Sequence, residues 1–414
     1  MNLLRNRNFA LLFTGFVLVQ GTLPLQITAQ IFWLQEHTDP DIRIVLVGLL
    51  ATIRGAGMLG FGIYGGALAD RFNRRRLLLT TQPLAIAMHA GILALIATTD
   101  AEPAALVPFF LLVLGSSALW AVDGPTRQAM VPDIIGQRAA VRGLALNTAG
   151  AWALTPITII ASGFLIDRVG FTGAYSLLTA FQIGAALVLI PLRYQRRDGR
   201  DRAAAAPGLR GIVDGLRYVR GHPTLRSVIL LMVLMTAIGM PAVSGLGPTW
   251  ITTVVGASFS EFGLIGAVWG LSGLIVSLTL TRFAALERLG IVIVLGAFLF
   301  AAGFILFAAD DTALFASLGN AGLGAGLVAT QIAGIALIAH LAPNAVRARI
   351  MSLLLLDRAL AQLLALPVAG VGQVVGLTTI FPILALTCLA AVSLVVALRP
   401  QIWRATTRQP THPD

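Results

Sequence analysis

The chain has 414 residues, of which 57% are hydrophobic and only 11% are charged, and its mean hydropathy is +0.87. Soluble domains carry about 25% charged residues, so this composition excludes a soluble globular protein and predicts an integral membrane protein. The apolar segments are long and continuous rather than short and alternating, which favours an all-α bundle over a β-barrel.

Charge and cysteine content exclude several function classes. The formal net charge is +11, and every basic residue is an arginine. Without lysine the chain has no P-loop, whose lysine contacts the phosphates, so we do not expect ATP hydrolysis. The single cysteine, Cys388, excludes a disulfide framework and a cysteine-based metal site. We see no catalytic constellation and expect no enzyme activity, no cofactor, no metal and no nucleic-acid partner.

Twelve apolar runs follow one another, and each is long enough to cross a bilayer as a helix. They cover residues 9–33, 42–69, 77–98, 104–123, 139–166, 170–192, 224–254, 258–283, 290–309, 312–341, 347–372 and 376–398. The first run is too long for a signal peptide and lacks a clear cleavage site. The sequence therefore predicts twelve transmembrane helices.

Arginine placement predicts the orientation of these spans. Most of the 29 arginines fall on segments that share a side with the N-terminus, whereas aspartate and glutamate gather on the other side. Because arginine marks the cytoplasmic side of a membrane, both termini are expected in the cytoplasm. We expect a monomer that lies in the lipid bilayer of the bacterial inner membrane.

The spans divide into two sets of six. The only long polar segment, 193–223, is rich in arginine and is expected to be a cytoplasmic linker. It separates an N-terminal half, 1–192, from a C-terminal half, 224–398, and a cytoplasmic tail, 399–414, follows. Parallel six-helix halves are typical of secondary transporters, whose binding site lies between the halves near the midplane.

Two local patterns support this organisation. Pro156 and Pro367 occupy matching places in the two halves, which favours two six-helix pseudo-repeats. Within the linker, apolar residues of 209–220 recur with helical spacing. This pattern predicts an amphipathic helix on the inner membrane surface, and a solvated linker is the alternative.

The charged turn between the second and third spans carries the most specific motif. Residues 66–75 read G-A-L-A-D-R-F-N-R-R and resemble the G-x-L-A-D-R-x-G-R-R signature of the major facilitator superfamily. Asn73 replaces the usual glycine, and both residues tolerate the left-handed backbone of a tight turn. Residues 124–133 and 215–223 are similar to segments of the branch that contains enterobactin exporters and macrolide-efflux pumps. The resemblance implies the major facilitator fold.

The resemblance also implies a charge cluster at this turn. Asp70 would face the N-terminus of span 11, where a helix dipole favours an anion, and would pair with Arg74 and Asp123. Such a cluster could latch the two halves on the inside and bias an alternating-access equilibrium. The predicted gating residues are Gly66, Asp70, Arg71, Arg74, Asp123 and Arg127. The alternative is that the arginines only anchor the topology.

Three charges lie far from the ends of their predicted spans: Arg54 in span 2, and Asp357 and Arg358 in span 11. An unpaired charge there costs at least about 2.5–3.5 kcal/mol. Spans 2 and 11 are neighbours in the superfamily, so we expect Arg54 to approach Asp357, either as a static ion pair or as a protonatable gate. Run 104–123 contains no arginine and the first run no acid, which leaves Asp357 as the only acid expected deep in the membrane.

Softer polar signals point to a central cavity. Its candidate lining residues are Gln20, Gln26, Gln30, Asn147, Trp152, Trp269 and Gln331. For the three glutamines, hydrogen bonding between helices is the alternative. Trp33, Trp120 and Trp250 lie near span ends, where an interfacial belt explains them better.

Together these features predict a secondary transporter that exports an amphipathic small molecule, either a drug or a siderophore-like compound, by proton antiport with alternating access. Scattered glutamine and tryptophan suit a large, partly apolar substrate. The alternatives are uptake of another metabolite and a non-transporting membrane sensor or scaffold. The sensor would be favoured if packed side chains filled the space between the halves.

Overall fold

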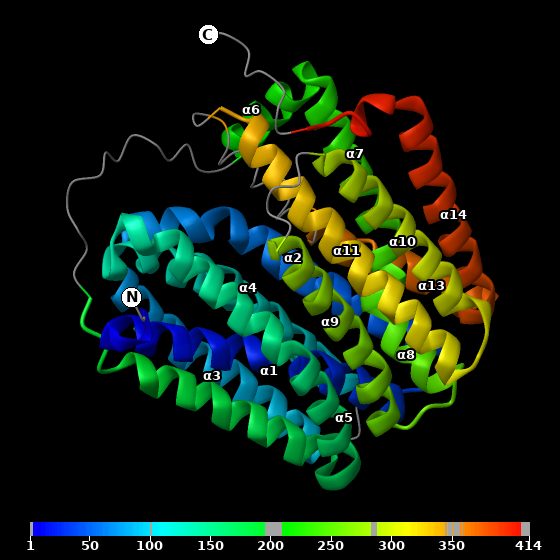
Figure 1. Cartoon of the computed structure of the whole chain (residues 1–414). Helices are drawn as coiled ribbons and strands as arrows, with labels where there is room; N and C mark the ends of the chain where they lie inside the picture. Colours follow the sequence, from blue (N-terminus) through cyan, green and yellow to red (C-terminus); the bar gives the residue numbers. More distant parts are fainter. Residues whose placement is uncertain are drawn as a thin grey trace.

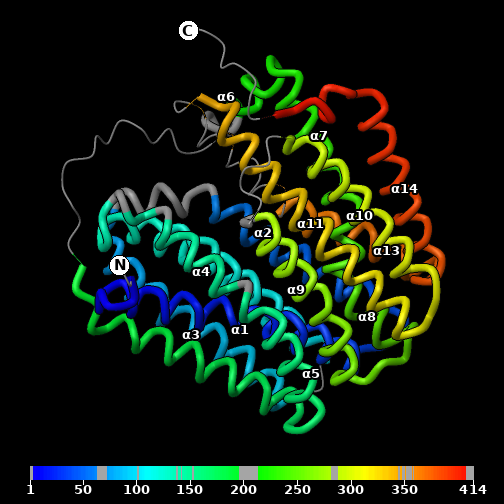
Figure 2. The backbone as a smooth tube through the Cα atoms, in the orientation of Figure 1, coloured from blue at the N-terminus to red at the C-terminus, as the bar shows by residue number. Residues whose placement is uncertain are grey.

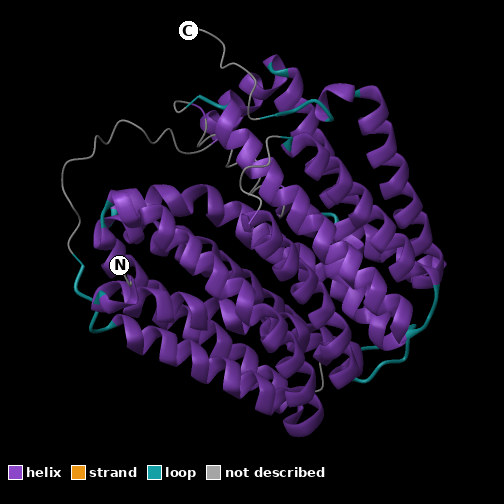
Figure 3. Cartoon of the chain, viewed as in Figure 1, coloured by secondary structure: helices purple, strands orange, loops and turns teal. Residues whose placement is uncertain are grey.

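The computed structural model describes residues 3–99, 102–194, 209–282, 288–343, 346, 350, 357 and 359–406. Within these ranges the chain consists of helices joined by short loops, and the described residues form no strand (Figure 3). For residues 63–71 and a few other helical positions the description is limited to the backbone.

The first half of the chain contains five helices in the order of the predicted spans. They are α1 (Arg7–His37), α2 (Pro40–Arg71), α3 (Arg74–Thr98), α4 (Pro103–Ile135) and α5 (Gln137–Leu189), preceded by the short η1 (Leu3–Arg5). Polar side chains set the starts of two of them. Asn6 accepts hydrogen bonds from the backbone N–H groups of Asn8 and Phe9, and Asn73 accepts one from Arg76. Such caps satisfy N–H groups that have no partner within the helix.

The second half begins after the linker. Its elements are α6 (Leu209–Gly221), α7 (Pro223–Met240), η3 (Pro241–Leu246), α8 (Gly247–Thr253), α9 (Phe259–Arg282), α10 (Leu289–Ala309), α11 (Ala313–Leu341), α13 (Ala365–Val375), α14 (Leu377–Leu398) and η4 (Pro400–Ile402). Residues 223–253 run as one continuous span through α7, η3 and α8. The helix predicted in the linker is confirmed as α6, whereas its place on a membrane surface stays a prediction.

Helix α5 supplies two of the predicted spans. It is continuous in hydrogen bonding, but at Gly170 the backbone has φ 68° and ψ −179°, a region that favours glycine. The chain reverses there, and the two arms of α5 run in opposite directions (Figure 1). Gly376, with φ 86°, makes the corresponding turn before α14.

The predicted spans are confirmed. In the described part of the chain ten helices are long and apolar enough to cross a membrane, and α5 counts once among them although it provides two spans. The shorter apolar helix of residues 359–375 is the described part of span 11. The fold is therefore an all-α bundle of twelve helices in two six-helix halves. The exact boundaries of the halves at residues 192 and 224 stay a prediction.

The two halves meet at one end and separate toward the other. In Figures 1 and 2 the first half, which runs from blue to green, and the second half, which runs from green through yellow to red, converge near the turn of α5 and diverge toward the ends that carry the termini. At the converging end the rings of Phe32 and Phe259 stack with centroids 4.6 Å apart. At the other end of α2, a Cβ added at Gly60 or Gly62 would meet no atom within 4 Å. The backbones of the two halves are therefore close at one end and apart at the other.

Small residues let the helices of the second half pack closely. Gly303 on α10 faces Gly322 on α11, and a Cβ added at either glycine would lie within 3 Å of the other helix. Without side chains at these positions, two backbones approach each other, which is how transmembrane helices associate. This rigid packing positions α11, which contributes to the cavity described below.

Candidate functional site

A cavity of about 280 Å³ lies between the two halves. Helices α1 to α5 line it from one half, and α7, η3, α9 and α11 together with Ala361 and Gln362 line it from the other. The first half contributes Arg54, His89 and Asp123 to the wall, and the described lining residues of the second half are all uncharged. The cavity thus has a charged side and a neutral, largely apolar side.

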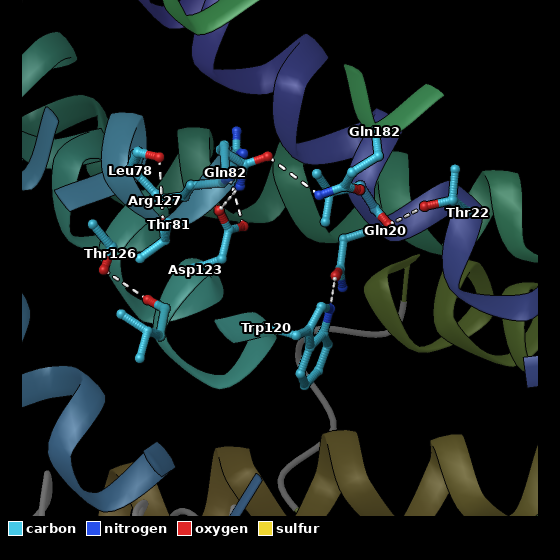
Figure 4. A network of polar contacts seen from close by, with 12 residues as sticks. Gln20, Thr22, Leu78, Thr81, Gln82, Trp120, Asp123, Thr126, Arg127 and Gln182 are labelled. Carbon is cyan, nitrogen blue, oxygen red and sulfur yellow. Dashed lines mark hydrogen bonds and ion pairs between the residues drawn. The ribbon is translucent and has the colours of Figure 1, made fainter. Parts of the chain in front are cut away.

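Asp123 is the centre of a buried polar network on the charged side (Figure 4). Its Oδ2 lies 2.7 Å from Nε of Arg127, and its Oδ1 accepts a hydrogen bond of 2.6 Å from Gln82. Gln182 on α5 donates in turn to Gln82, at 3.2 Å. Three helices, α3, α4 and α5, therefore hold one carboxylate at the cavity wall.

Arg127 is fully buried, and its charge is only partly satisfied. Its Nη1 and Nη2 have no hydrogen-bond partner among the described residues. The guanidinium lies against α1, where a Cβ added at Gly15 would be 2.7 Å from Nη1. A buried guanidinium depends strongly on its counter-ion, so Arg127 ties the charge state of Asp123 to the packing of α1 against α4.

The position of this pair corrects two expectations. Span 4 was expected to end near Asp123 and to contain no arginine, and Asp357 was expected to be the only acid deep in the membrane. Helix α4 instead continues to Ile135 through Pro125 and Pro132, so Asp123 and Arg127 lie inside the bundle. Proline does not end this helix because neighbouring helices in a membrane bundle satisfy the freed backbone groups.

Arg54 makes a second network on the same wall, and the expected contact with Asp357 is wrong. Arg54 donates a hydrogen bond to Oε1 of Gln30, and Gln30 donates to the hydroxyl of Tyr175 at 2.9 Å. The Tyr175 hydroxyl lies 3.3 Å from Nδ1 of His89. Asp357 is buried but is not a lining residue. The neutral amide of Gln30 on α1 is the hydrogen-bond partner of the guanidinium instead, through one of its N–H groups.

Spans 2 and 11 are neighbours, as expected, although the two charges do not meet. Thr52 on α2 donates to the backbone oxygen of Gln362 at 3.2 Å, and it accepts from the N–H of Leu366 at 3.1 Å. Arg358 and the side chain of Trp152 lie outside the described residues. The described polar contacts between the halves at α2 are therefore made by Thr52 with backbone groups of span 11, and by the Gln373 side chain with backbone groups of α2.

Three of the candidate cavity residues lie on the wall of this cavity, and their contact with substrate stays a prediction. Gln26, Trp269 and Gln331 line the cavity. Gln20 accepts a hydrogen bond of 3.1 Å from the indole N–H of Trp120, which is itself a lining residue. Gln20 therefore orients a lining residue and does not line the cavity itself. It acts as a hydrogen-bonding group between α1 and α4, which was the alternative to cavity lining.

Other expected positions differ. Gln30 is fully buried behind Arg54, and Asn147 is buried without lining the cavity. The interfacial belt is wrong for the three tryptophans. Trp120 faces the cavity, while Trp33 and Trp250 are buried in aromatic clusters. The sequence reasoning also missed Gln82, His89 and Gln182, whose signal was the same as that of Gln26: a polar residue inside an apolar run.

The residues of the cluster expected around the charged turn do not all lie together: Asp123 and Arg127 pair with each other on α4, while Arg74 pairs with Asp133. Helix α2 extends to Arg71 and α3 begins at Arg74, so the turn is only two residues long. Asn73 has φ −64° and ψ 115°, and the expected left-handed conformation is wrong because this residue caps α3. The side chains of Asp70 and Arg71 and the surroundings of Gly66 lie outside the described part.

The expected pairing of Asp70 with Arg74 and Asp123 depends on the side chain of Asp70, which lies outside the described part of the chain. Among the described residues, the ion-pair partner of Arg74 is Asp133, and that of Asp123 is Arg127. The geometry around Arg74 shows which helices this guanidinium joins. Its Nη1 lies 2.7 Å from Oδ2 of Asp133 near the end of α4, and the Tyr194 hydroxyl donates to the same oxygen at 2.6 Å. Burial, followed by the hydrogen bond to Asp133, raises the pKa of Tyr194 to about 12. Arg75 donates to the backbone oxygens of Leu192 and Ile190, where an arginine complements the helix dipole. These arginines thus join α3 to the ends of α4 and α5 within one half.

The converging end of the halves is closed by polar and aromatic contacts. Gln35 on α1 donates to the hydroxyl of Thr249 and accepts from that of Thr252 at 3.0 Å. Asp167 on α5 accepts a hydrogen bond of 2.8 Å from the backbone N–H of Ser260 on α9. These bonds connect elements of opposite halves, and they close the cavity at this end.

A bundle of two helical halves around a polar cavity defines a multi-pass membrane transporter of small molecules. The family model of the Major Facilitator Superfamily matches residues 8–366. The chain belongs to this superfamily of secondary transporters, which is not a family of enzymes.

Curated relatives are distant. The staphyloferrin A transporter of Staphylococcus aureus is 22% identical over 60% of this chain and 60% of its own length. The multidrug efflux pump Tap of Mycolicibacterium fortuitum is 26% identical over 64% of this chain and 67% of its own length. The enterobactin exporter EntS of Shigella boydii is 24% identical over 60% of this chain and 58% of its own length. The chain therefore spans less than two thirds of the length of two of these relatives.

Solved structures agree on the fold. The nucleoside transporter NupG matches with a TM-score of 0.73 and 14% identity over 97% of this chain and 100% of its own. A bacterial homologue of the human lysosomal transporter Spinster, in an inward-facing conformation, matches with a TM-score of 0.68 and 14% identity over 97% of this chain and 96% of its own. At these identities the likeness describes the fold alone.

Proposed function

We propose that this chain exports an amphipathic small molecule across the bacterial inner membrane by proton antiport with alternating access. The observation that carries the proposal is the central cavity, which both halves line and which holds the buried acid Asp123. An open cavity of about 280 Å³ argues against a sensor or scaffold with a filled centre. Ligand sites combine apolar walls with a few convergent polar groups, as this cavity does.

The packing of the two ends supports alternating access. The halves contact each other through Gln35, Thr249 and the Asp167–Ser260 bond at one end, and they diverge at the other (Figure 1). The arginine bias supports a cytoplasmic position for the diverging end, and in the proposed cycle this conformation accepts substrate from the inside. Export then requires that the closing contacts break and that a cytoplasmic contact, with Asp70 and Arg71 as its proposed residues, forms instead.

Asp123 is the proposed proton carrier, in place of Asp357. A carboxylate at the cavity wall is reached by water when the cavity is open. Asp123 is bonded directly to α3 and α4, and to α5 through Gln82. Protonation would remove the charge that holds Arg127. Since Arg127 packs against α1, the loss of its counter-ion would bias the equilibrium between conformations. Asp357 is buried but does not line the cavity.

The names of the distant relatives support export of a siderophore or a drug. Two of them are described as an enterobactin exporter and a multidrug efflux pump. Uptake remains the second candidate for the direction of transport, since the staphyloferrin A transporter is named without a direction. The mixed wall of glutamines and tryptophans suits an amphipathic molecule in either direction.

The proposal is tested by substrate-driven proton movement in proteoliposomes with a pH dye inside. An anionic, a neutral and a cationic fluorescent amphiphile are added to wild type, Asp123→Asn, Asp123→Glu and Asp357→Asn. We expect proton flux with at least one amphiphile, its loss in Asp123→Asn, and partial retention in Asp123→Glu. Asp41→Asn, at an exposed position of α2, is the matched control and should behave as wild type.

Two results would contradict the proposal. Substrate movement without proton flux in wild type would refute antiport. If Asp123→Asn keeps full proton coupling and Asp357→Asn loses it, the proton carrier is Asp357 in span 11 and not Asp123. Everted vesicles, which reverse the accessible face, decide the direction: uptake into such vesicles on energisation corresponds to export from the cell.

A further inference from the structure

The charges that line the cavity do not cancel. Asp123 is neutralised by Arg127, whose Nε is 2.7 Å away, and its other oxygen is occupied by Gln82. Arg54 lines the same cavity. Within the described residues no carboxylate lies at ion-pair distance from it, and its hydrogen-bond partner is the neutral amide of Gln30. The wall therefore carries one positive charge in excess.

The guanidinium of Arg54 is held in a fixed orientation at the cavity wall. Its side chain is more than nine-tenths buried, so the protein holds the guanidinium in one place. Gln30 orients it, and Gln30 is itself held by the hydroxyl of Tyr175. A guanidinium has five N–H donors, and Gln30 accepts from a single one of them. The remaining donors are not among the buried groups that lack a partner, and they belong to a residue that lines the cavity.

Among the lining residues that the structure describes, no other ionisable group offsets this charge. His89 also lines the cavity, and its protonation adds positive charge. The second half contributes only uncharged lining residues in the described part, among them Met240, Trp269 and Leu327. A cationic substrate would find no free anion on this wall, whereas an anion would find a desolvated and oriented guanidinium.

We propose that Arg54 forms an anion subsite that binds the carboxylate of an amphipathic substrate, whose apolar body lies against Trp269, Met240 and Leu327. The inference rests on the proposed transport function and names its substrate class. Arginine binds a planar oxyanion through two parallel hydrogen bonds, and a buried charge gains most when its partner is an opposite charge. The subsite selects amphipathic acids over amines of the same shape.

The test is a binding measurement with matched probes. 2-Naphthylacetic acid, 2-naphthylacetamide and 2-(2-naphthyl)ethylamine share an apolar body and differ in charge. Calorimetry on the full chain in nanodiscs gives their affinities for wild type, Arg54→Gln and Arg54→Lys. Arg43→Gln is the matched control, because Arg43 lies on the same helix and does not line the cavity.

We expect wild type to bind the acid about tenfold more tightly than the amide, and the amine most weakly. Arg54→Gln should lose about tenfold in affinity for the acid and keep its affinity for the amide, while Arg54→Lys should keep part of the preference. A wild type that prefers the amine, or that does not bind the acid, overturns the proposal. So does a preference for the acid that survives in Arg54→Gln.

This experiment separates the subsite from the transport mechanism. Binding is measured without a proton gradient, so failed proton coupling leaves its result unchanged. An acid preference that depends on Arg54, in a protein that moves no protons, would refute antiport and retain the anion subsite. Proton flux that is driven by an amine and by no acid would support antiport and refute the anion subsite.

Discussion

Asp123 and Arg127 lie one helical turn apart on α4, with Oδ2 of the aspartate 2.7 Å from Nε of the arginine, and both side chains are buried. The pair joins the wall of the cavity to the contact between α4 and α1. Each residue compensates the charge of the other, so removing either one leaves an unpaired buried charge that lowers the stability of the protein.

Removing one partner should destabilise the protein. Asp123→Asn leaves Arg127 buried without a counter-ion, and breaking a buried pair in this way costs roughly 3–5 kcal/mol. We expect a clear fall in the thermal unfolding midpoint in detergent. The double variant Asp123→Asn, Arg127→Met removes both charges and should recover most of the loss. Equal midpoints for wild type and Asp123→Asn would contradict the burial of the pair.

Tyr194 should make stability depend on pH in the alkaline range. Its folded pKa of about 12 lies above the ordinary value of 10.0, so the folded state keeps a proton that the unfolded state loses. The stabilisation by Tyr194 is fully present below pH 10 and is lost as pH rises toward 12. The difference between the unfolding midpoints of wild type and Tyr194→Phe should be constant up to pH 10 and shrink above it. A difference that grows above pH 10 would mean that the pKa of Tyr194 is lowered, not raised, in the folded state.

The contact between α5 and α9 should control the closed end of the cavity. A Cβ at Gly163 would overlap the backbone oxygen of Phe259, so Gly163→Ala should weaken the contact between the halves. The readout is maleimide labelling of Thr249→Cys, a fully buried position, in a background with Cys388→Ala. We expect faster labelling with Gly163→Ala.

Gly184→Ala is the control for that experiment, because a Cβ at Gly184 would meet no atom within 4 Å. It should leave the labelling rate unchanged. If Gly163→Ala also has no effect, the contact does not limit opening of this end.

Helix α6 should bind an anionic membrane surface. Val213 and Leu216 are about half exposed and, three residues apart, lie on one face of the helix, while the side chain of Arg217 is 78% exposed. Apolar burial and arginine charge both favour an anionic bilayer. Hydrogen exchange in α6 should be slower in anionic than in zwitterionic nanodiscs, and Val213→Ser with Leu216→Ser should remove the difference. Equal exchange in both lipids would support the solvated linker.

Several features of the site could be predicted from the sequence. Gln26, Trp269 and Gln331 were predicted to line the cavity because polar groups inside apolar runs face the bundle interior. The same reasoning would have found Gln82 and Gln182 if it had been applied to every apolar run. Asp123 was found as a charged residue but was assigned to the cluster at the charged turn, because the predicted span ended at residue 123.

The amino-acid sequence by itself determined the twelve spans, the division into two halves and the helix in the linker. These depend on hydropathy, length and periodicity, which are properties of neighbouring residues and need no partner. Only the tertiary structure decided that Arg54 contacts Gln30, that Arg74 contacts Asp133, and that Asp123 faces the cavity. A buried charge takes whichever partner the packing of other helices brings within about 3 Å, and that distance depends on residues far apart in the chain.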